Sequence, residues 1–270
     1  MIQRVADRYR SRFKKRFLEI AEGVRGSVPD GDLRDAIAMG QWWNLMSLIP
    51  WDTFAEGMAG YGELIEPLVD EAGNRAMVYA ERITKQGFIV GSPFVQGFIR
   101  ARTAFLATEV VGESMQATSE AITRAFQAQA PPTAAARRVK ASIGLTRQQA
   151  RAVDARRAAM LEAGVDPSRI TRAANVQALR YLRERASTIA ETETMTGANE
   201  GTKQAWDQAS REGILPPGQI VEWVVVPDDR LCPRCQPMAG VRVRVGQQFP
   251  GGGPPLHIRC RCGTALVVGG

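Results

Sequence analysis

Hydrophobic residues recur every three or four positions along most of the chain, a spacing that places them on one face of an α-helix. In residues 2–24 this face is flanked by basic side chains, and its members are Ile2, Val5, Tyr9, Phe13, Phe17, Ile20 and Val24. Further helices are expected at 32–49, 94–126, 147–163 and 167–212, and helical periodicity interrupted by glycines is found at 53–85. Thr146 and Gln149 form a capping-box pattern at one helix start. Core packing is expected for Trp42, Trp43 and Trp51.

The pattern changes after Pro216, Pro217 and Gly218. Beyond this break, apolar and polar residues alternate at 220–226 and 241–245, as they do in β-strands. The sequence therefore predicts an α+β protein, mainly α-helical in its N-terminal and middle regions, with a small β-rich C-terminal module. The expected regions are 1–90, helical with a basic first helix; 91–130, a long helix; 131–219, helical; and 220–270, the cysteine-rich β module. A linker is expected at 127–136, which contains two adjacent prolines.

All four cysteines and the single histidine lie in this last region. Cys232 and Cys235 are separated by two residues, and a segment long enough for a β-hairpin precedes His257, Cys260 and Cys262. Two short chelating groups that a hairpin brings together are typical of a tetrahedral structural zinc site. The sequence predicts that this zinc stabilises the module and that the ligands are Cys232, Cys235, Cys260 and Cys262.

Other interpretations of this cluster stay open. His257 is an alternative ligand in place of one cysteine, because spacing does not rank three groups that lie so close together. Free or redox-active thiols are further alternatives, although Cys232 follows a strand and a turn rather than opening a helix. Disulfides need an oxidising compartment. We expect a cytosolic chain, since the sequence shows neither a secretory leader nor an apolar run of membrane-spanning length.

Several segments of the C-terminal half match the pattern of one known family. Trp223 is followed by Asp228, Arg230, Cys232 and Cys235, and the chain later reaches Gly240 and a Pro-Pro-x-His-x-x-Cys-Arg-Cys ending. Upstream, the matching segments are 143–146 and 185–194, with Asn199 and Gly201. Across residues 94–266 the chain resembles the phage Mu F-like minor head proteins, also described as the phage head morphogenesis family. It departs from their pattern at Glu191, where an arginine is usual, and at Ile258 and Arg259, where Pro-Asn is usual.

The charge balance adds a further candidate interaction. The chain carries 35 Lys and Arg against 28 Asp and Glu, and this net charge of +7 favours anionic partners such as nucleic acid. The candidate phosphate contacts lie on the first helix and on the strand at 241–245; they are Arg4, Arg8, Arg12, Lys15, Arg242 and Arg244. A second basic segment at 137–157 contains Asp154 as its only acid. Either segment can instead be a solvated helix face.

The resemblance implies a non-enzymatic minor capsid protein of a tailed phage or prophage, active in head assembly. Its implied location is the capsid interior or portal vertex of the virion, and the host cytoplasm during assembly. The implied partners are the portal protein, a capsid or scaffolding protein and double-stranded DNA during packaging or ejection. Two alternatives are a zinc-ribbon-like nucleic-acid-binding protein and a hydrolase or transferase that uses Asp228 or Glu193.

Overall fold

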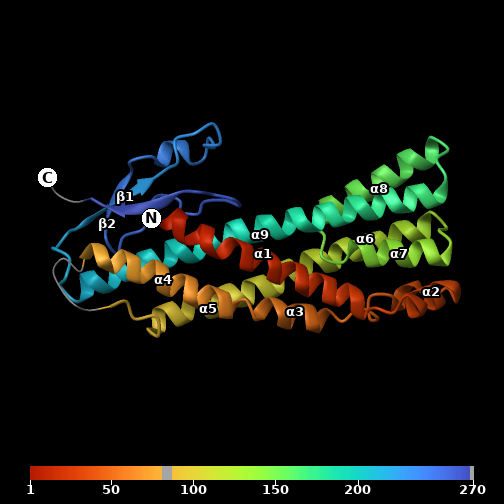
Figure 1. The fold of residues 1–270 in the computed structure, drawn as a ribbon, viewed down its shortest axis with the longest axis horizontal. Coiled ribbons are helices and arrows are strands. Elements are labelled where there is room, and N and C mark those ends of the chain that lie inside the picture. The colour runs from red at the N-terminus through yellow and green to blue at the C-terminus, as the bar shows by residue number, and fades with distance from the viewer. Residues whose placement is uncertain (81–86, 268–270) are drawn as a thin grey trace. The chain divides into compact units, whose positions relative to one another are not determined.

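The computed structural model describes residues 1–80 and 87–267 (Figure 1). The helices are α1 (Ile2–Ser27), α2 (Asp30–Ala38), α3 (Trp51–Ala59), α4 (Gly62–Ala80), α5 (Pro93–Phe105), α6 (Val111–Gln127), α7 (Pro132–Ser142), α8 (Arg147–Glu162) and α9 (Pro167–Arg211). The strands are β1 (Ile220–Val224), β2 (Arg242–Arg244) and β3 (Gly263–Leu266). A mainly helical chain that ends in a small antiparallel sheet confirms the predicted fold class.

The chain divides into two compact units. Unit 1 comprises Met1–Phe13, Gly62–Ala101 and Thr188–Gly270, and unit 2 comprises Lys14–Tyr61 and Arg102–Ser187. Helices α1, α5 and α9 each supply residues to both units. The cysteine-rich module therefore belongs to the same unit as the C-terminal part of α9.

The strongest periodic patterns gave the most accurate predictions. Helices α1, α8 and α9 lie where the sequence placed them, and the apolar face predicted for α1 is buried except for the half-buried Ile20. The capping box at α8 is confirmed, because Thr146 Oγ1 accepts from the Gln149 backbone N–H at 3.2 Å and Gln149 Oε1 accepts from the Thr146 N–H at 3.1 Å.

Three element boundaries differ from the prediction. The helix expected to reach Ile49 ends at Ala38, because Gly40 adopts a positive φ of 72° that breaks the helix. The expected linker at 127–136 is much shorter, since Pro132 opens α7 at a position where proline suits a helix start. The helical stretch expected over 53–85, with interruptions at glycines, is divided between α3 and α4, and its residues 81–85 lie outside the described residues.

In unit 1, strand β1 lies between β2 and β3 and pairs antiparallel with both. Strand β3 was not predicted, because its four residues, Gly-Thr-Ala-Leu, are too short for an alternating pattern. Trp223 on β1 is fully buried and packs edge-on against Phe249 with ring centroids 5.3 Å apart. Helix α9 approaches α4 closely at Gly201, where an added Cβ would collide with the Val69 carbonyl oxygen. A glycine is required there for the two helices to pack.

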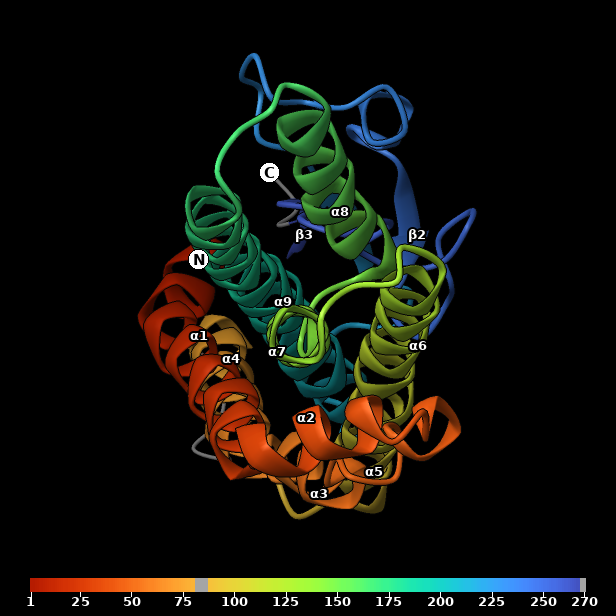
Figure 2. The same cartoon turned by 90° about the vertical axis from the view of Figure 1, so that its right-hand side faces the viewer.

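In unit 2, helices α7 and α8 both lie against α6 (Figure 2). The predicted helix at 94–126 is interrupted by a π-helical segment, Leu106–Val110, between α5 and α6. Arg185 on α9 is 4% exposed and donates to the Val110 carbonyl at 2.9 Å, the Gly144 carbonyl at 3.0 Å and Glu113 at 2.8 Å. Burial lowers the pKa of Arg185 to about 10, so that it stays charged at neutral pH. One buried guanidinium thus satisfies carbonyls from two separate segments.

Replacing Arg185 tests this role. Arg185→Met removes the side-chain donor of two buried carbonyl oxygens and leaves Glu113 without its partner, and we expect it to lower the free energy of unfolding by about 3 kcal/mol. Arg183→Met, at an exposed position of the same helix, is the matched control and should change stability by less than about 0.5 kcal/mol. Urea unfolding monitored by circular dichroism measures both. Equal midpoints for the two variants would show that Arg185 does not stabilise unit 2.

Candidate metal centre

The cysteines and His257 lie on two loops, one after β1 and the other before β3. The pairing of Val224 with Gly263 places the end of β1 beside the start of β3, so both loops leave the sheet at the same end. Each loop makes a tight turn at its ligand pair: the Cys235 N–H donates to the Cys232 carbonyl at 3.0 Å, and the Cys260 N–H donates to the His257 carbonyl at 3.1 Å. The chelating turns thus meet as predicted, but the pairing of β1 with β3 brings them together instead of the expected hairpin between them, since β2 is the one strand of the described residues that lies between the turns.

Five potential ligand atoms gather between these turns in two groups that share Cys235. His257 Nε2 lies 3.0 Å from Cys232 Sγ and 3.1 Å from Cys235 Sγ. Cys235 Sγ lies 3.7 Å from Cys260 Sγ, and Cys262 joins these two in the second group. All four cysteines are reduced, and three of them are buried. Thiolates and imidazole at these separations are a donor set that suits zinc.

The thiols differ in how readily they lose a proton. A hydrogen bond from Cys262 lowers the pKa of Cys260 to about 5, and the same interaction raises the pKa of Cys262. Burial raises the pKa of Cys235 to about 12. A metal that binds at neutral pH would therefore displace a proton from Cys235, whose pKa is raised, but not from Cys260, and its affinity would depend on pH.

Polar side chains of α9 attach the cluster to the helical part of unit 1. Asn199 donates to the Cys262 carbonyl at 3.1 Å, and Thr192 Oγ1 accepts from the Arg259 N–H at 3.2 Å. Arg259 also forms a 3.1 Å ion pair with Glu191. Arg259 and Glu191 are two of the positions where the chain departs from the family pattern, and the structure shows that they contact each other.

Asp228 fixes the two loops of the cluster to each other. Arg261, between Cys260 and Cys262, donates to both carboxylate oxygens of Asp228 at 2.6 Å. This bidentate pair holds the pKa of Asp228 far below its usual range. A carboxylate held in this way is a poor general base, so its contacts favour a structural role.

The cations predicted to contact nucleic acid are partly neutralised by carboxylates. Arg8 pairs with Glu71, Lys15 lies 3.6 Å from Glu19, and the Arg242 guanidinium donates to Glu222 at 2.7 Å. The Arg12 guanidinium lies over the Tyr9 ring. Among the described residues, Arg4 and Arg244 form no ion pair. These six residues stay candidates, with fewer free charges than the sequence suggested.

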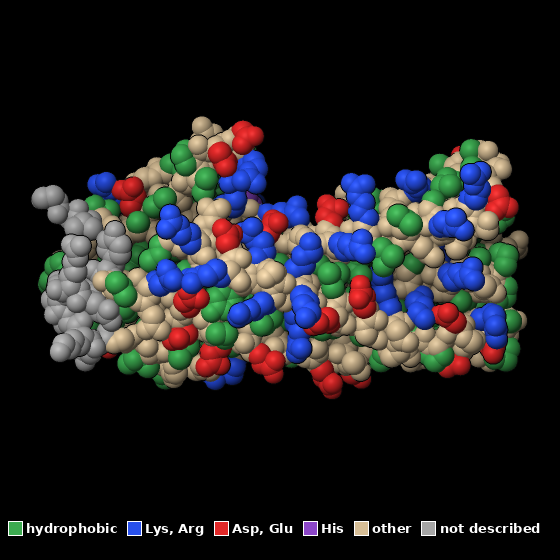
Figure 3. All heavy atoms as spheres, viewed as in Figure 1, with side chains coloured by type: hydrophobic (Ala, Val, Ile, Leu, Met, Phe, Trp, Pro, Cys, Tyr) green, Lys and Arg blue, Asp and Glu red, His purple; other side chains and the backbone are tan. Residues whose placement is uncertain are grey.

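A second group of positive charges lies on α6–α8 of unit 2, which we call the arginine surface. It comprises Arg124, Arg137, Arg138, Arg147, Arg151, Arg156 and Arg157. Only two carboxylates of the described residues contact these arginines: Asp154 binds Arg124 and Arg138, and Glu120 binds Arg124, Arg147 and Arg151. The sequence showed one acid within this basic segment, Asp154. The structure adds a second carboxylate, Glu120 of α6, which contacts arginines of the same segment. Figure 3 shows Lys and Arg side chains gathered over the part of the view where Figure 1 labels α8.

The electrostatics of this surface follow from those contacts. Hydrogen bonds from Arg151 and then Arg147 lower the pKa of Glu120 to about 2, so Glu120 stays ionised at neutral pH. Arg157 is partly desolvated, which lowers its pKa, and two of its guanidinium nitrogens are buried without a hydrogen-bond acceptor among the described residues. The surface therefore retains uncompensated positive charge.

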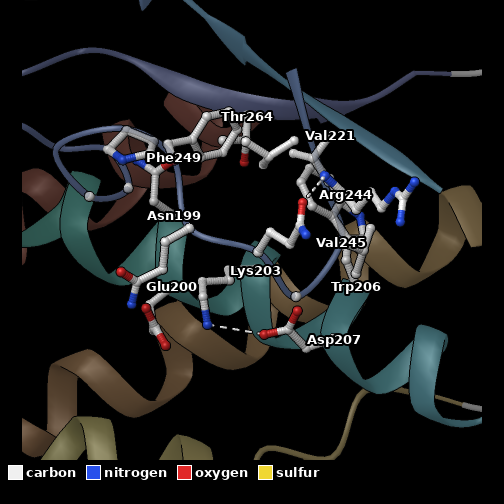
Figure 4. Close-up of a pocket in the computed structure, with 17 residues that line it drawn as sticks. Asn199, Glu200, Lys203, Trp206, Asp207, Val221, Arg244, Val245, Phe249 and Thr264 are labelled. Atoms are coloured by element: carbon white, nitrogen blue, oxygen red, sulfur yellow. Dashed lines mark hydrogen bonds and ion pairs between the residues drawn. The ribbon is translucent and has the colours of Figure 1, made fainter. Parts of the chain in front are cut away.

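A separate pocket in unit 1 is shown in Figure 4. Its volume is about 350 Å³, and it lies between α9 and the segment that follows β2. Lys203 and Asp207 form a 3.0 Å ion pair on its wall, and Glu200 and Arg244 add one charge of each sign. Neither a cysteine nor His257 lines this pocket, so it is distinct from the metal centre.

Comparison with known proteins bears on residues 112–265, where the model of the family described as Phage Mu protein F like protein matches. The chain belongs to this family. The match covers more than half of the chain and includes α9, nearly all of the sheet and the whole Cys/His cluster, which confirms the resemblance found in the sequence. No curated protein and no solved structure gives a significant match. Within the described residues, no helix is both long and apolar enough to cross a bilayer.

Proposed function

We propose that this chain is a minor capsid protein that acts in head morphogenesis of a tailed phage or prophage, without enzymatic activity of its own. Its membership of the phage Mu F-like family is the observation that carries this proposal. The proposed location is the virion, at the portal vertex or in the capsid interior, with assembly in the host cytoplasm. The proposed partners are the portal protein and a capsid or scaffolding protein.

The architecture supports an assembly role over catalysis. Asp228, one alternative catalytic residue, is held by Arg261 in a bidentate ion pair. Glu193, the other alternative, is buried on α9. Long helices instead provide extended surfaces of the kind that protein partners can bind.

Deleting the gene from the parent phage tests the assembly role. We expect purified wild-type heads to contain the chain in a few copies, and the deletion to lower the yield of infectious particles at least about tenfold. Quantitative mass spectrometry of purified heads and plaque titres measure these two effects. A chain absent from purified heads, together with unchanged titres, would contradict the proposal.

We further propose that the metal of the Cys/His cluster is zinc and that its role is structural. The donor set supports this, because thiolates with an imidazole are the ligands of closed tetrahedral zinc sites. Bound zinc supplies a strong crosslink between the loop after β1 and the loop before β3. Here the chain's own residues orient that crosslink: Asp228 and Arg261 join the two loops, and Asn199 holds the Cys262 carbonyl.

A second candidate role is contact with double-stranded DNA, and the arginine surface is the observation that favours it. Only two carboxylates of the described residues form ion pairs with the seven arginines of this surface. Guanidinium groups bind phosphates well. A surface of this kind binds the DNA backbone without sequence preference and with steep salt dependence. The residues predicted on α1 and β2 remain the competing location.

Three variants separate these locations. Arg151→Gln/Arg156→Gln should lower the slope of log affinity against log salt by about 2, because each phosphate that the variant no longer neutralises reduces the slope by about 0.9. Glu120→Gln removes a competing anion and should strengthen binding. Arg4→Gln/Arg8→Gln on α1 is the matched control and should leave the slope unchanged. Fluorescence anisotropy with a short duplex at several salt concentrations measures all three. A slope that falls only in the α1 variant would place DNA there instead.

A further inference from the structure

We infer that the zinc ligands are Cys232, Cys235, His257 and Cys260, and that Cys262 lies outside the coordination sphere. This inference rests on the proposed structural zinc and names its ligand set. It differs from the four-cysteine set that the sequence favoured.

The hydrogen bonding of His257 is the first observation behind this choice. Its Nδ1 lies 2.8 Å from the Ile258 carbonyl oxygen, which can only accept a hydrogen bond. In a neutral imidazole, Nδ1 must therefore carry the proton and Nε2 must carry the lone pair. That lone pair faces Cys232 and Cys235 at 3.0 and 3.1 Å. An imidazole whose other nitrogen donates to a backbone carbonyl is the usual arrangement of a metal-bound histidine.

The second observation concerns Cys260 and Cys262. Cys260 Sγ lies 3.7 Å from Cys235 Sγ, and two sulfurs bound to one tetrahedral zinc lie about 3.8 Å apart, given Zn–S bonds of about 2.3 Å. Cys260 and Cys262 both belong to the second group, which shares Cys235 with the group of Cys232 and His257. The Cys262 side chain interacts with Trp223, and its carbonyl accepts from Asn199. Cys262 is thus also held by the packing of the module, through contacts that Cys260 does not share.

The turn geometry agrees with this ligand set. Arg259 adopts a positive φ of 60°, which is uncommon for a residue other than glycine. This conformation closes the turn in which the Cys260 N–H donates to the His257 carbonyl. The Arg259 N–H and guanidinium are in turn held by Thr192 and Glu191. The turn therefore presents His257 and Cys260 as a chelating pair opposite Cys232 and Cys235.

The competing arrangement uses all four cysteines and a doubly protonated His257. In it both imidazole nitrogens donate, one to Ile258 and the other to metal-bound sulfurs. The two arrangements differ in the number of thiolates bound to the metal, three or four, and in which variant loses it.

The experiment measures zinc content and affinity of the full chain and of three variants. Elemental analysis gives the stoichiometry, competition with a chelating dye gives the affinity, and the intensity of the sulfur-to-cobalt absorption after Co²⁺ substitution reports the number of thiolates. We expect one zinc per wild-type chain. Cys262→Ser should keep the metal within about tenfold of the wild-type affinity and leave the cobalt band unchanged. His257→Gln and Cys260→Ser should each weaken binding by more than about 100-fold, beyond the loss typical of residues outside the coordination sphere.

Each outcome decides a separate point. Loss of the metal in Cys262→Ser with retention in His257→Gln would overturn the ligand set and leave the structural zinc in place. A wild-type chain without zinc would overturn the structural zinc together with its ligand set, and would leave the assembly role to its own test. Cys262→Ala repeats the comparison without a hydroxyl group, and circular dichroism checks that every variant remains helical.

Discussion

The C-terminal module depends on the contact between two chelating turns, which meet at Cys235. The sheet consists of three short strands of five, three and four residues, so its backbone pairing is limited. Its own core is limited to a few large side chains, of which Trp223 and Phe249 form the centre. The metal crosslink that we propose between the loops, together with the ion pair of Asp228 and Arg261, adds to this core. The polar residues of α9 then hold the crosslinked loops against the helix.

This dependence explains why so many polar groups of α9 lie within unit 1. Asn199 is 5% exposed, and Thr192 and Glu191 lie on the same stretch of helix. Each of them contacts the loop that carries His257, Cys260 and Cys262. A helix that packed only against apolar surface would not need them. The match to the family model likewise covers both the helix and the module, consistent with one structural unit.

The sequence predicted the features that depend on local patterns. Long helices with a clear period, the capping box at Thr146 and the gathering of cysteines could all be found this way. Features decided by distant partners could not. Trp43 was expected in the core and is 80% exposed, because helix α2 ends before it. The partners of the cations, such as Glu71 for Arg8 and Glu120 for Arg151, lie 63 and 31 residues away along the chain. The choice between His257 and Cys262 likewise depends on a carbonyl and a helix that spacing does not reveal.

Amide hydrogen exchange of the metal-loaded chain, before and after treatment with a chelator, tests the central claim most directly. If the Cys/His cluster holds the module together, removing the metal should abolish protection at β1, β3 and the loops at 228–235 and 256–262. Protection of α6–α8 in unit 2 should be unchanged in the same sample. Unchanged protection of the module after complete metal removal would contradict the account and show that packing alone maintains it.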